Sequence, residues 1–275
     1  ATSATCVTGL VVFDTYQYWS IFGQLVIIVL IQIGGLGFIT FGVGFSMFLK
    51  RKIGLARRNL IQESVSALKL AGVVKLVKKI IIGTAIFEGI GAVLLAIRFV
   101  PKMGLLVGIY NAVFHSISAF CNAGFDLMGR YEQYSSLTVY SSDIVINITI
   151  MLLIIIGGLG FIVWDDIWHN RLNFKKYSLH SKIVLISTTV LVFGSAILFG
   201  IFENNNLMQN MNPLEKVLAS LFASVTARTA GFNTIDLGAM TQSSKLLTDV
   251  LMFIGGSPGS TAGGVKTTSI VVMIF

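Results

Sequence analysis

Charged side chains are scarce in this sequence. Only 12% of its 275 residues are Asp, Glu, Lys or Arg, and 55% are hydrophobic. Soluble domains carry about 25% charged residues. A chain with so few charges cannot cover a globular surface in water, so the composition excludes a soluble domain and places the chain in lipid.

Cysteines and catalytic groups are also few. The two cysteines, Cys6 and Cys121, occupy equivalent places in two similar short motifs, and we interpret them as small packing residues rather than as a disulfide. His115 lies on a short apolar segment without the Cys, His or Asp neighbours of a metal site, so we expect it to serve packing. No nucleophile, base and orienting group form a recognisable set. The sequence therefore predicts no enzyme and no bound cofactor.

The ends of the chain lack familiar signals. The first residues have neither the basic start nor the cleavage pattern of a signal peptide. They already form one of the short motifs described below, and the last residues, TSIVVMIF, stop inside an apolar run. We therefore expect a fragment of a longer protein.

Long apolar runs are what the sequence has in abundance. Each is long enough to cross a bilayer as a helix, although GGSPGSTAGG interrupts the last one. Two shorter runs, residues 105–120 and 213–227, are typical of re-entrant segments, and Asn212 with Pro213 predicts the start of the second. The long runs are residues 19–49, 79–97, 144–164, 183–202 and 246–275.

Basic residues predict the orientation. They gather between the first two long runs, against the single acid Glu63, and again after the third run. The positive-inside rule makes both loops cytoplasmic and puts the short runs on the external side, where most acids lie. Such loops fit anionic lipid rather than nucleic acid. The basic residues are Lys50, Arg51, Lys52, Arg57, Arg58, Lys69, Lys75, Lys78 and Lys79, then Arg171, Lys175, Lys176 and Lys182.

A repeat organises the chain. The motifs CVTGL, CNAGF and RTAGF align on Gly9, Gly124 and Gly231, and each precedes a second run that carries QIGGLGF, IIGGLGF or FIGGSPG. The pattern predicts an all-α membrane protein built from parallel units of helix, short pore helix, Gly turn and helix. The glycines of the second runs are expected to allow close helix packing: Gly34, Gly35, Gly37, Gly157, Gly158 and Gly160.

Small residues before a Gly suit a narrow backbone with positive φ. Where a chain re-enters the membrane, its carbonyls must be buried in protein or line a water-filled path. Inward carbonyls can replace the hydration shell of an ion, and the C-terminal end of a short helix favours a cation. Three such turns in equivalent places predict a cation pore rather than ordinary Gly-rich turns.

The segment GGSPGSTAGGVKTT cannot be a regular helix. It lies halfway along the last run and combines Pro258, five glycines and the single charge of Lys266. We expect a polar, flexible loop below the pore. A phosphate-binding Gly loop is the rival interpretation, but the spacing G-x-x-x-x-G-K-S/T and the preceding strand are missing.

Two charges fall inside the apolar runs. Arg228 lies two residues before Ala230, where a cation filter would be opposed by a charge facing the ion, so we expect it behind the filter, paired with an acid or with carbonyls. Glu88 lies in the middle of a long run. It is either a buried hydrogen-bonded carboxyl or the partner of Arg228 or Lys266, and the sequence leaves both alternatives open.

The chain resembles the potassium-translocating subunits of the Trk/Ktr/HKT superfamily, above all the membrane subunits of bacterial Ktr systems. The resemblance covers essentially the whole chain and rests on TCVTGL, FCNAGF, ARTAGF and GGSPGSTAGGVKTT. It implies four units in pseudo-four-fold symmetry around one pore, with one filter strand in each unit. This chain would hold the strand and second span of unit 1 (residues 1–52), a basic loop (53–78), unit 2 (79–169), a loop (170–181) and unit 3 with a broken second span (182–275), while unit 4 is not present.

The resemblance also implies roles for individual residues. Sodium-preferring plant relatives carry Ser at the first filter glycine, so Gly9 favours potassium over sodium. The broken segment would be an intramembrane gate that obstructs the pore and moves on activation. The filter carbonyls would come from Val7, Thr8, Gly9, Asn122, Ala123, Gly124, Thr229, Ala230 and Gly231. The gate would consist of Gly255, Gly256, Ser257, Pro258, Gly259, Ser260, Thr261, Ala262, Gly263, Gly264 and Lys266.

The resemblance implies K⁺ as the transported ion, with Na⁺ as an alternative, in a multi-pass protein of the bacterial cell membrane. It implies a homodimer on a cytoplasmic nucleotide-binding regulatory ring (KtrA-like), with nucleotide bound only by that ring. Two other hypotheses stay open: an ion-coupled symporter whose substrate site is the broken helix, and a non-conducting scaffold subunit.

Overall fold

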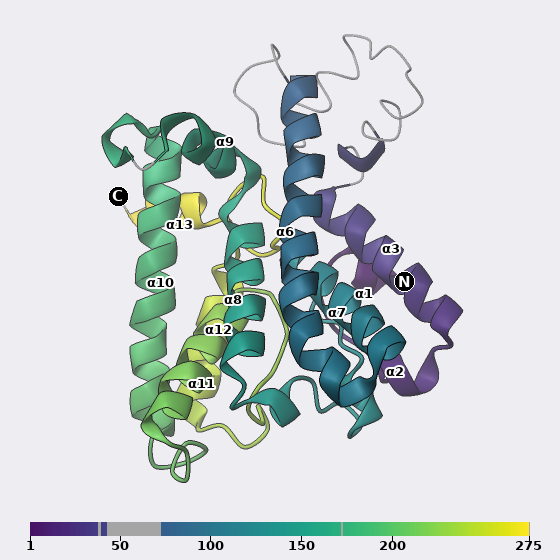
Figure 1. Cartoon of the computed structure of the whole chain (residues 1–275). Helices are drawn as coiled ribbons and strands as arrows, with labels where there is room; N and C mark the ends of the chain where they lie inside the picture. The colour runs from purple at the N-terminus through teal and green to yellow at the C-terminus, as the bar shows by residue number, and fades with distance from the viewer. Residues whose placement is uncertain (38–39, 43–72, 172, 275) are drawn as a thin grey trace.

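The structure, a computed structural model, describes residues 1–37, 40–42, 73–171 and 173–274. Its regular elements in these ranges are helices, and only an isolated bridge pairs Ile254 with Val265 (Figure 1). The predicted all-helical class is therefore confirmed for the described ranges. The longer helices are α3 (Ile21–Leu36), α6 (Val73–Met103), α7 (Leu105–Phe120), α8 (Ile144–Leu159), α9 (Phe161–Asn170), α10 (Leu179–Glu203), α11 (Pro213–Thr226), α12 (Gln242–Phe253) and α13 (Thr267–Ile274).

Short helical turns complete the chain. They are α1 (Thr2–Thr5), α2 (Thr15–Tyr18), η1 (Met128–Arg130), η2 (Thr138–Tyr140) and η3 (Phe174–Lys176). Most of the predicted basic loop between the first two apolar runs lies outside the described residues, including Lys50, Arg51, Lys52, Arg57, Arg58, Glu63 and Lys69.

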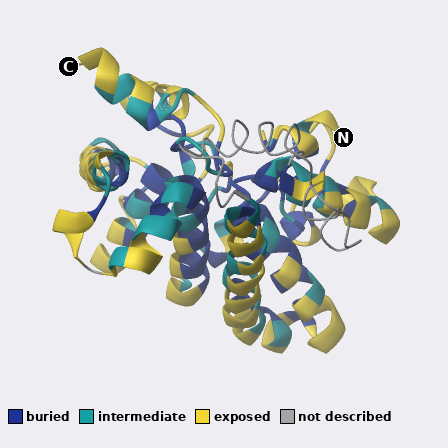
Figure 2. Cartoon of the chain, turned by 90° about the horizontal axis from the view of Figure 1, so that it is seen from above, coloured by how far each residue is buried: buried dark blue, intermediate teal, exposed yellow. Residues whose placement is uncertain are grey.

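The helices α6 and α10 are each long and apolar enough to cross a membrane. Helix α6 begins at Val73, earlier than the predicted run, so Lys75 and Lys78 lie on its first turns. Each of these two helices exposes a stripe of large apolar side chains, such as Ile90 and Val93 on α6 and Phe193 on α10. Buried residues gather in the middle of the molecule and exposed ones on the outer faces of its helices (Figure 2). This distribution fits lipid around the chain.

The two predicted short runs form the helices α7 and α11. Helix α7 matches its prediction from Leu105 to Phe120, and α11 starts as predicted, with Asn212 as N-cap and Pro213 at its first position. The carboxylate of Glu215 accepts a hydrogen bond from the Asn212 amide at 3.0 Å, which completes the start of α11. Both helices occupy the lower half of Figure 1, beside α6 and α10 respectively.

The prediction of uninterrupted helices over residues 19–49 and 144–164 is wrong. Helix α3 begins at Ile21 and ends at Leu36, because Gly37 adopts a φ of +81° that an α-helix does not allow. Gly160 has a φ of +92°, and α8 and α9 meet there at 95°. The last glycine of each GGLG motif therefore ends a helix instead of packing inside it.

The first glycines of the same motifs do allow close packing, as predicted. A Cβ added to Gly34 would overlap the Thr5 carbonyl oxygen, and one added to Gly157 would overlap the equivalent oxygen of Phe120. Both oxygens belong to the last residue of a short helix. The GGLG motifs thus let the second helix of a unit touch the end of its short helix.

This contact predicts that G157A destabilises the full-length protein by about 1–3 kcal/mol, because the added methyl group overlaps backbone that cannot move aside easily. Thermal unfolding in detergent measures the effect. G194A is the matched control, since a Cβ at Gly194 of α10 meets nothing within 4 Å. Equal unfolding temperatures for the two variants would contradict the prediction.

Candidate functional site

The three Gly motifs form three turns of the same shape. We call them turn 1 (residues 7–9), turn 2 (122–124) and turn 3 (229–231). In each, the first residue and the glycine have positive φ: 54° and 72° in turn 1, 56° and 68° in turn 2, 68° and 89° in turn 3. Val7, Asn122 and Thr229 carry side chains, for which this conformation is rare. The surrounding structure therefore imposes the turn geometry three times.

Hydrogen bonds from the preceding helix hold each turn. The middle residue donates its amide back into the helix: Thr8 to Ser3 at 3.0 Å, Ala123 to Ser118 at 2.8 Å, and Ala230 to Thr226 at 3.0 Å. In turns 2 and 3 a hydroxyl of the helix also binds the strand beyond the glycine. Ser118 Oγ donates to the Phe125 carbonyl at 2.7 Å, and Thr226 Oγ1 donates to the Phe232 carbonyl at 2.6 Å. These two hydroxyls were not predicted from the sequence, although Ser118 and Thr226 stand six and five residues before the aligned glycines.

The three turns converge in order. A Cβ added to Gly9 would lie 2.7 Å from the carbonyl oxygen of Ala123 in turn 2, and one added to Gly124 would overlap the carbonyl oxygen of Ala230 in turn 3. Turn 1 therefore lies against turn 2, and turn 2 against turn 3. Residues more than one hundred positions apart meet here through backbone, with no room for a side chain.

The broken run forms a loop, as the sequence predicted. Helix α12 ends at Phe253 and α13 starts at Thr267. Between them the chain folds back on itself, because Gly255 donates to the Val265 carbonyl and Gly256 to the Gly263 carbonyl, both at 3.1 Å. Lys266 is half-buried, and its Nζ donates to the Ala262 carbonyl at 2.8 Å. We call residues 254–266 the broken segment.

The broken segment is anchored on unit 2, at the GGLG motif and the end of α7. Ser257 and Thr261 donate their amides to the carbonyls of Gly158 and Gly157 at 3.1 and 3.2 Å. The Thr261 hydroxyl donates to the Phe120 carbonyl at 2.9 Å, directly before turn 2. The Gly259 carbonyl accepts a hydrogen bond from the Phe161 amide at 2.8 Å. This amide lies at the bend between α8 and α9 and is the first of α9. The bend and the loop thus satisfy each other's backbone groups.

Glu88 is a hydrogen-bonded carboxyl. Gln32 Nε2 of α3 donates to Glu88 Oε2 at 3.3 Å, and the Cys121 thiol lies 3.9 Å from Oε1. This arrangement matches the first alternative for Glu88 and not the second, since within the described ranges neither Arg228 nor Lys266 bonds to it. The group lies behind turn 2 and joins unit 1 to unit 2. Gln32 was not singled out from the sequence.

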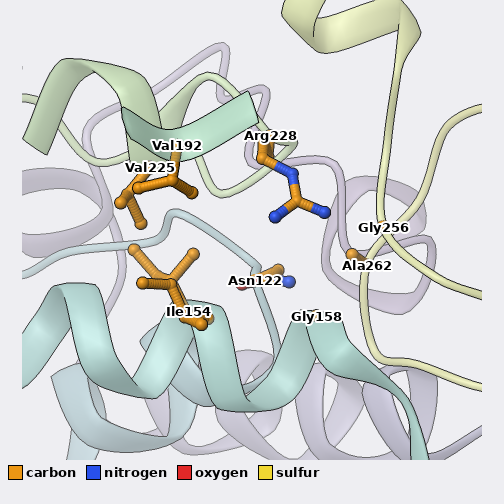
Figure 3. Close-up of a pocket in the computed structure, with 9 residues that line it drawn as sticks. Asn122, Ile154, Gly158, Val192, Val225, Arg228, Gly256 and Ala262 are labelled. Carbon is orange, nitrogen blue, oxygen red and sulfur yellow. The ribbon is translucent and has the colours of Figure 1, made fainter. Parts of the chain in front are cut away.

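Arg228 directly precedes turn 3 and is only 6% exposed. The expected pairing is not found, because its Nε and Nη2 have no hydrogen-bond partner within the described part of the chain. Its guanidinium points into a small cavity toward the side chain of Asn122 (Figure 3). The side-chain Nδ2 and Oδ1 of Asn122 also have no hydrogen-bond partner within the described part of the chain.

Several acids on the predicted external side have structural tasks. Asp14 caps α2 and accepts from the Tyr134 amide at 3.0 Å, while Asp143 caps α8 and pairs with Arg98 of α6 at 2.7 Å. Glu203 accepts from the Thr241 amide at 2.9 Å. Asp126 follows turn 2 directly, and burial, with a smaller contribution from nearby Asp14, raises its pKa to about 6. His115 also supports the loop after turn 2, because its Nε2 accepts from the Leu127 amide at 3.3 Å.

Known proteins resemble the chain over its whole length. The profile of the TrkH family, described as a cation transport protein, matches residues 1–274. The potassium/sodium uptake protein NtpJ of Enterococcus hirae is 42% identical over 100% of this chain and 60% of its own length. The Ktr system potassium uptake protein B of Bacillus subtilis is 43% identical over 100% of this chain and 61% of its own length. The chain thus spans about three fifths of the curated relatives it matches.

A solved structure shares the fold. The potassium transporter TrkH from Vibrio parahaemolyticus superposes with a TM-score of 0.72 at 19% identity, over 99% of this chain and 52% of that one.

Proposed function

This chain belongs to the TrkH family of cation transport proteins, and on that premise we propose that it forms part of a pathway for K⁺ across a membrane. The resemblance drawn from its motifs is confirmed at the level of the family, as is the prediction of a transporter rather than an enzyme. Its apolar helices make it a membrane protein. The K⁺ cargo, the route of the ion and the device that controls it are the proposal.

The observation that carries the proposal is the convergence of three turns of one shape at the ends of three short helices. We assign their carbonyls, from Val7 to Gly9, from Asn122 to Gly124 and from Thr229 to Gly231, to a filter in which they replace the hydration shell of K⁺. Three turns leave one side of a four-fold ring open. A fourth turn, from sequence outside these residues, would close it.

The broken segment is the proposed gate. It lies beneath the filter end of α7, because the Thr261 hydroxyl binds the Phe120 carbonyl at 2.9 Å. Its two amide hydrogen bonds to the GGLG motif of unit 2 are donated by the loop residues Ser257 and Thr261, so they can break without unfolding a helix. Lys266 places one positive charge on the loop, which opposes cations while the loop stays in the pathway.

The partners follow the family. We propose a homodimer on a cytoplasmic nucleotide-binding ring, with the short helices toward the outside of a bacterial cell membrane and the basic loops toward the cytoplasm, against anionic lipid. The relatives are named as uptake proteins, in agreement with transport inward.

Flux of K⁺ and Na⁺ through the full-length protein in liposomes tests the function. K⁺ flux that follows an imposed K⁺ gradient without a second ion is the expected result. A strict requirement for a co-transported ion would replace the channel by the symporter, with the broken segment as its substrate site. Absence of any cation flux would overturn the proposal.

Protonation of Asp126 gives a pH-dependent prediction. Since its pKa is raised to about 6, the carboxylate is charged at neutral pH and loses its charge as the external pH falls through about 6. The mouth of the filter then attracts cations less, so we expect K⁺ uptake to fall by a factor of about two to three. D126N should remove the pH step, whereas E132Q, at an exposed acid of the same loop, should keep it. A step unchanged in D126N would refute the assignment.

A further inference from the structure

The cavity between Arg228 and Asn122 is not explained by conduction of cations. It lies behind turns 2 and 3, between units 2 and 3, and its other walls are the apolar side chains of Ile154, Val192 and Val225 (Figure 3). The cavity has a volume of about 10 Å³. This is enough room for a single small occupant.

The donors that point into this cavity have no acceptor. Arg228 is 6% exposed and Asn122 is 1% exposed. Neither the Nε and Nη2 of Arg228 nor the side-chain amide of Asn122 has a partner in the described ranges. A buried guanidinium without a counter-charge is strongly unfavourable, and a neutral water molecule satisfies hydrogen bonds but not the charge. The occupant should therefore be negative.

The repeat shows where a protein carboxylate would come from. In unit 2 the Ser116 hydroxyl of α7 donates to the Glu88 carbonyl at 2.7 Å, and in unit 3 the Ser224 hydroxyl of α11 donates to the Val192 carbonyl at 2.6 Å. Ser116 and Ser224 stand eight and seven residues before the aligned glycines, so Glu88 and Val192 occupy similar places on the long helix of each unit.

The motif alignment pairs Cys121 with Arg228, since each stands three residues before the aligned glycine. Unit 2 has an acid on the helix and a neutral residue before the turn, whereas unit 3 has Val192 on the helix and the cation of Arg228 before the turn. The position that holds a carboxylate in unit 2 is apolar in unit 3, so within the described ranges no carboxylate stands there to neutralise Arg228.

We propose that this cavity binds one monatomic anion of halide size, chloride under physiological conditions, held by the guanidinium of Arg228 and the side-chain amide of Asn122. The space excludes phosphate and carboxylate solutes, and the apolar walls favour a weakly hydrated ion. Gly256 and Ala262 of the broken segment line the same cavity. The anion would thus neutralise Arg228 beside the filter and connect the filter to the loop.

Bromide provides the direct test. Crystals of the full-length protein grown in bromide should show an anomalous peak in contact with Arg228, and R228Q should lose it. V192E is the second variant: it places a carboxylate where unit 2 has one, so it should displace bromide while Arg228 stays. K176Q, which removes an exposed cytoplasmic charge, should keep the peak.

Three results would overturn the site. They are no peak beside Arg228, a peak that persists in R228Q and is therefore an adventitious ion only, and a carboxylate from outside these residues in contact with Arg228. The anomalous map does not depend on K⁺ transport, so it tests the anion site separately from the proposed function. In liposomes, replacing chloride by gluconate should lower K⁺ flux severalfold in the unmodified protein and leave V192E unaffected.

Discussion

Replacing Gly124 by alanine is expected to lower K⁺ flux through the full-length protein at least about tenfold, which corresponds to ~1.4 kcal/mol or more on the barrier. Gly124 has a φ of +68°, which strains any side chain. An added Cβ would also overlap the carbonyl oxygen of Ala230 in turn 3. That oxygen is one of the proposed ligands of K⁺, so G124A displaces it and separates turns 2 and 3. Rubidium or potassium flux in liposomes measures the loss.

A matched control separates the filter from general damage. G89A adds the same methyl group to α6, where a Cβ at Gly89 meets nothing within 4 Å. Both variants should purify as folded protein, G124A with the lower unfolding temperature, but only G124A should lose flux. Normal flux in G124A would show that turns 2 and 3 do not form the conducting surface.

The opposite result is expected at the broken segment, where G255A should raise K⁺ flux severalfold. A Cβ at Gly255 would overlap the carbonyl oxygen of Gly263. The change therefore breaks the hydrogen bond from Gly256 to that oxygen, together with the adjoining bridge between Ile254 and Val265. These contacts fold the loop back beneath the filter, and without them its obstructing arrangement is less populated. Shortening the segment should act in the same direction.

The control for the gate lies in the same loop. A Cβ at Gly263 meets nothing within 4 Å, so G263A tests the loss of a glycine without a collision. G263A should conduct like the unmodified protein, while G255A conducts faster in the absence of the regulatory ring. Equal flux in the two variants, with both proteins folded, would remove the gate assignment.

Periodicity and local signals were enough for much of the fold. The length of an apolar run predicted helix α7, and Asn212 with Pro213 predicted the start of α11. The break before α13 came from Pro258 and its neighbouring glycines. For the two GGLG motifs, the sequence predicted close packing at the small residues but not the helix ends at Gly37 and Gly160, which have positive φ. A conformation set by contacts with another unit has no local signature.

For the buried charged residues too, the sequence predicted their importance but not their surroundings. Glu88 and Arg228 were recognised as exceptional because ionised groups are costly in lipid. The residues that face them could not be identified from the sequence. Gln32 lies 56 positions from Glu88, and Asn122 lies across a cavity from Arg228. For the acids on the predicted external side, the sequence predicted a general attraction for cations. The structure adds that Asp14, Asp143 and Glu203 form helix caps and hydrogen bonds.

The sequence by itself determined that this chain lies in a membrane, that it repeats a short helix and a Gly turn three times, and that its last run is broken. Composition, run length and the conformational limits of Gly and Pro act locally, so they can be deduced from the order of residues. Only the tertiary structure decided which turns meet, where the second helices bend, and which groups face Arg228. These depend on contacts between units more than one hundred residues apart, and such contacts form only when the helices pack together.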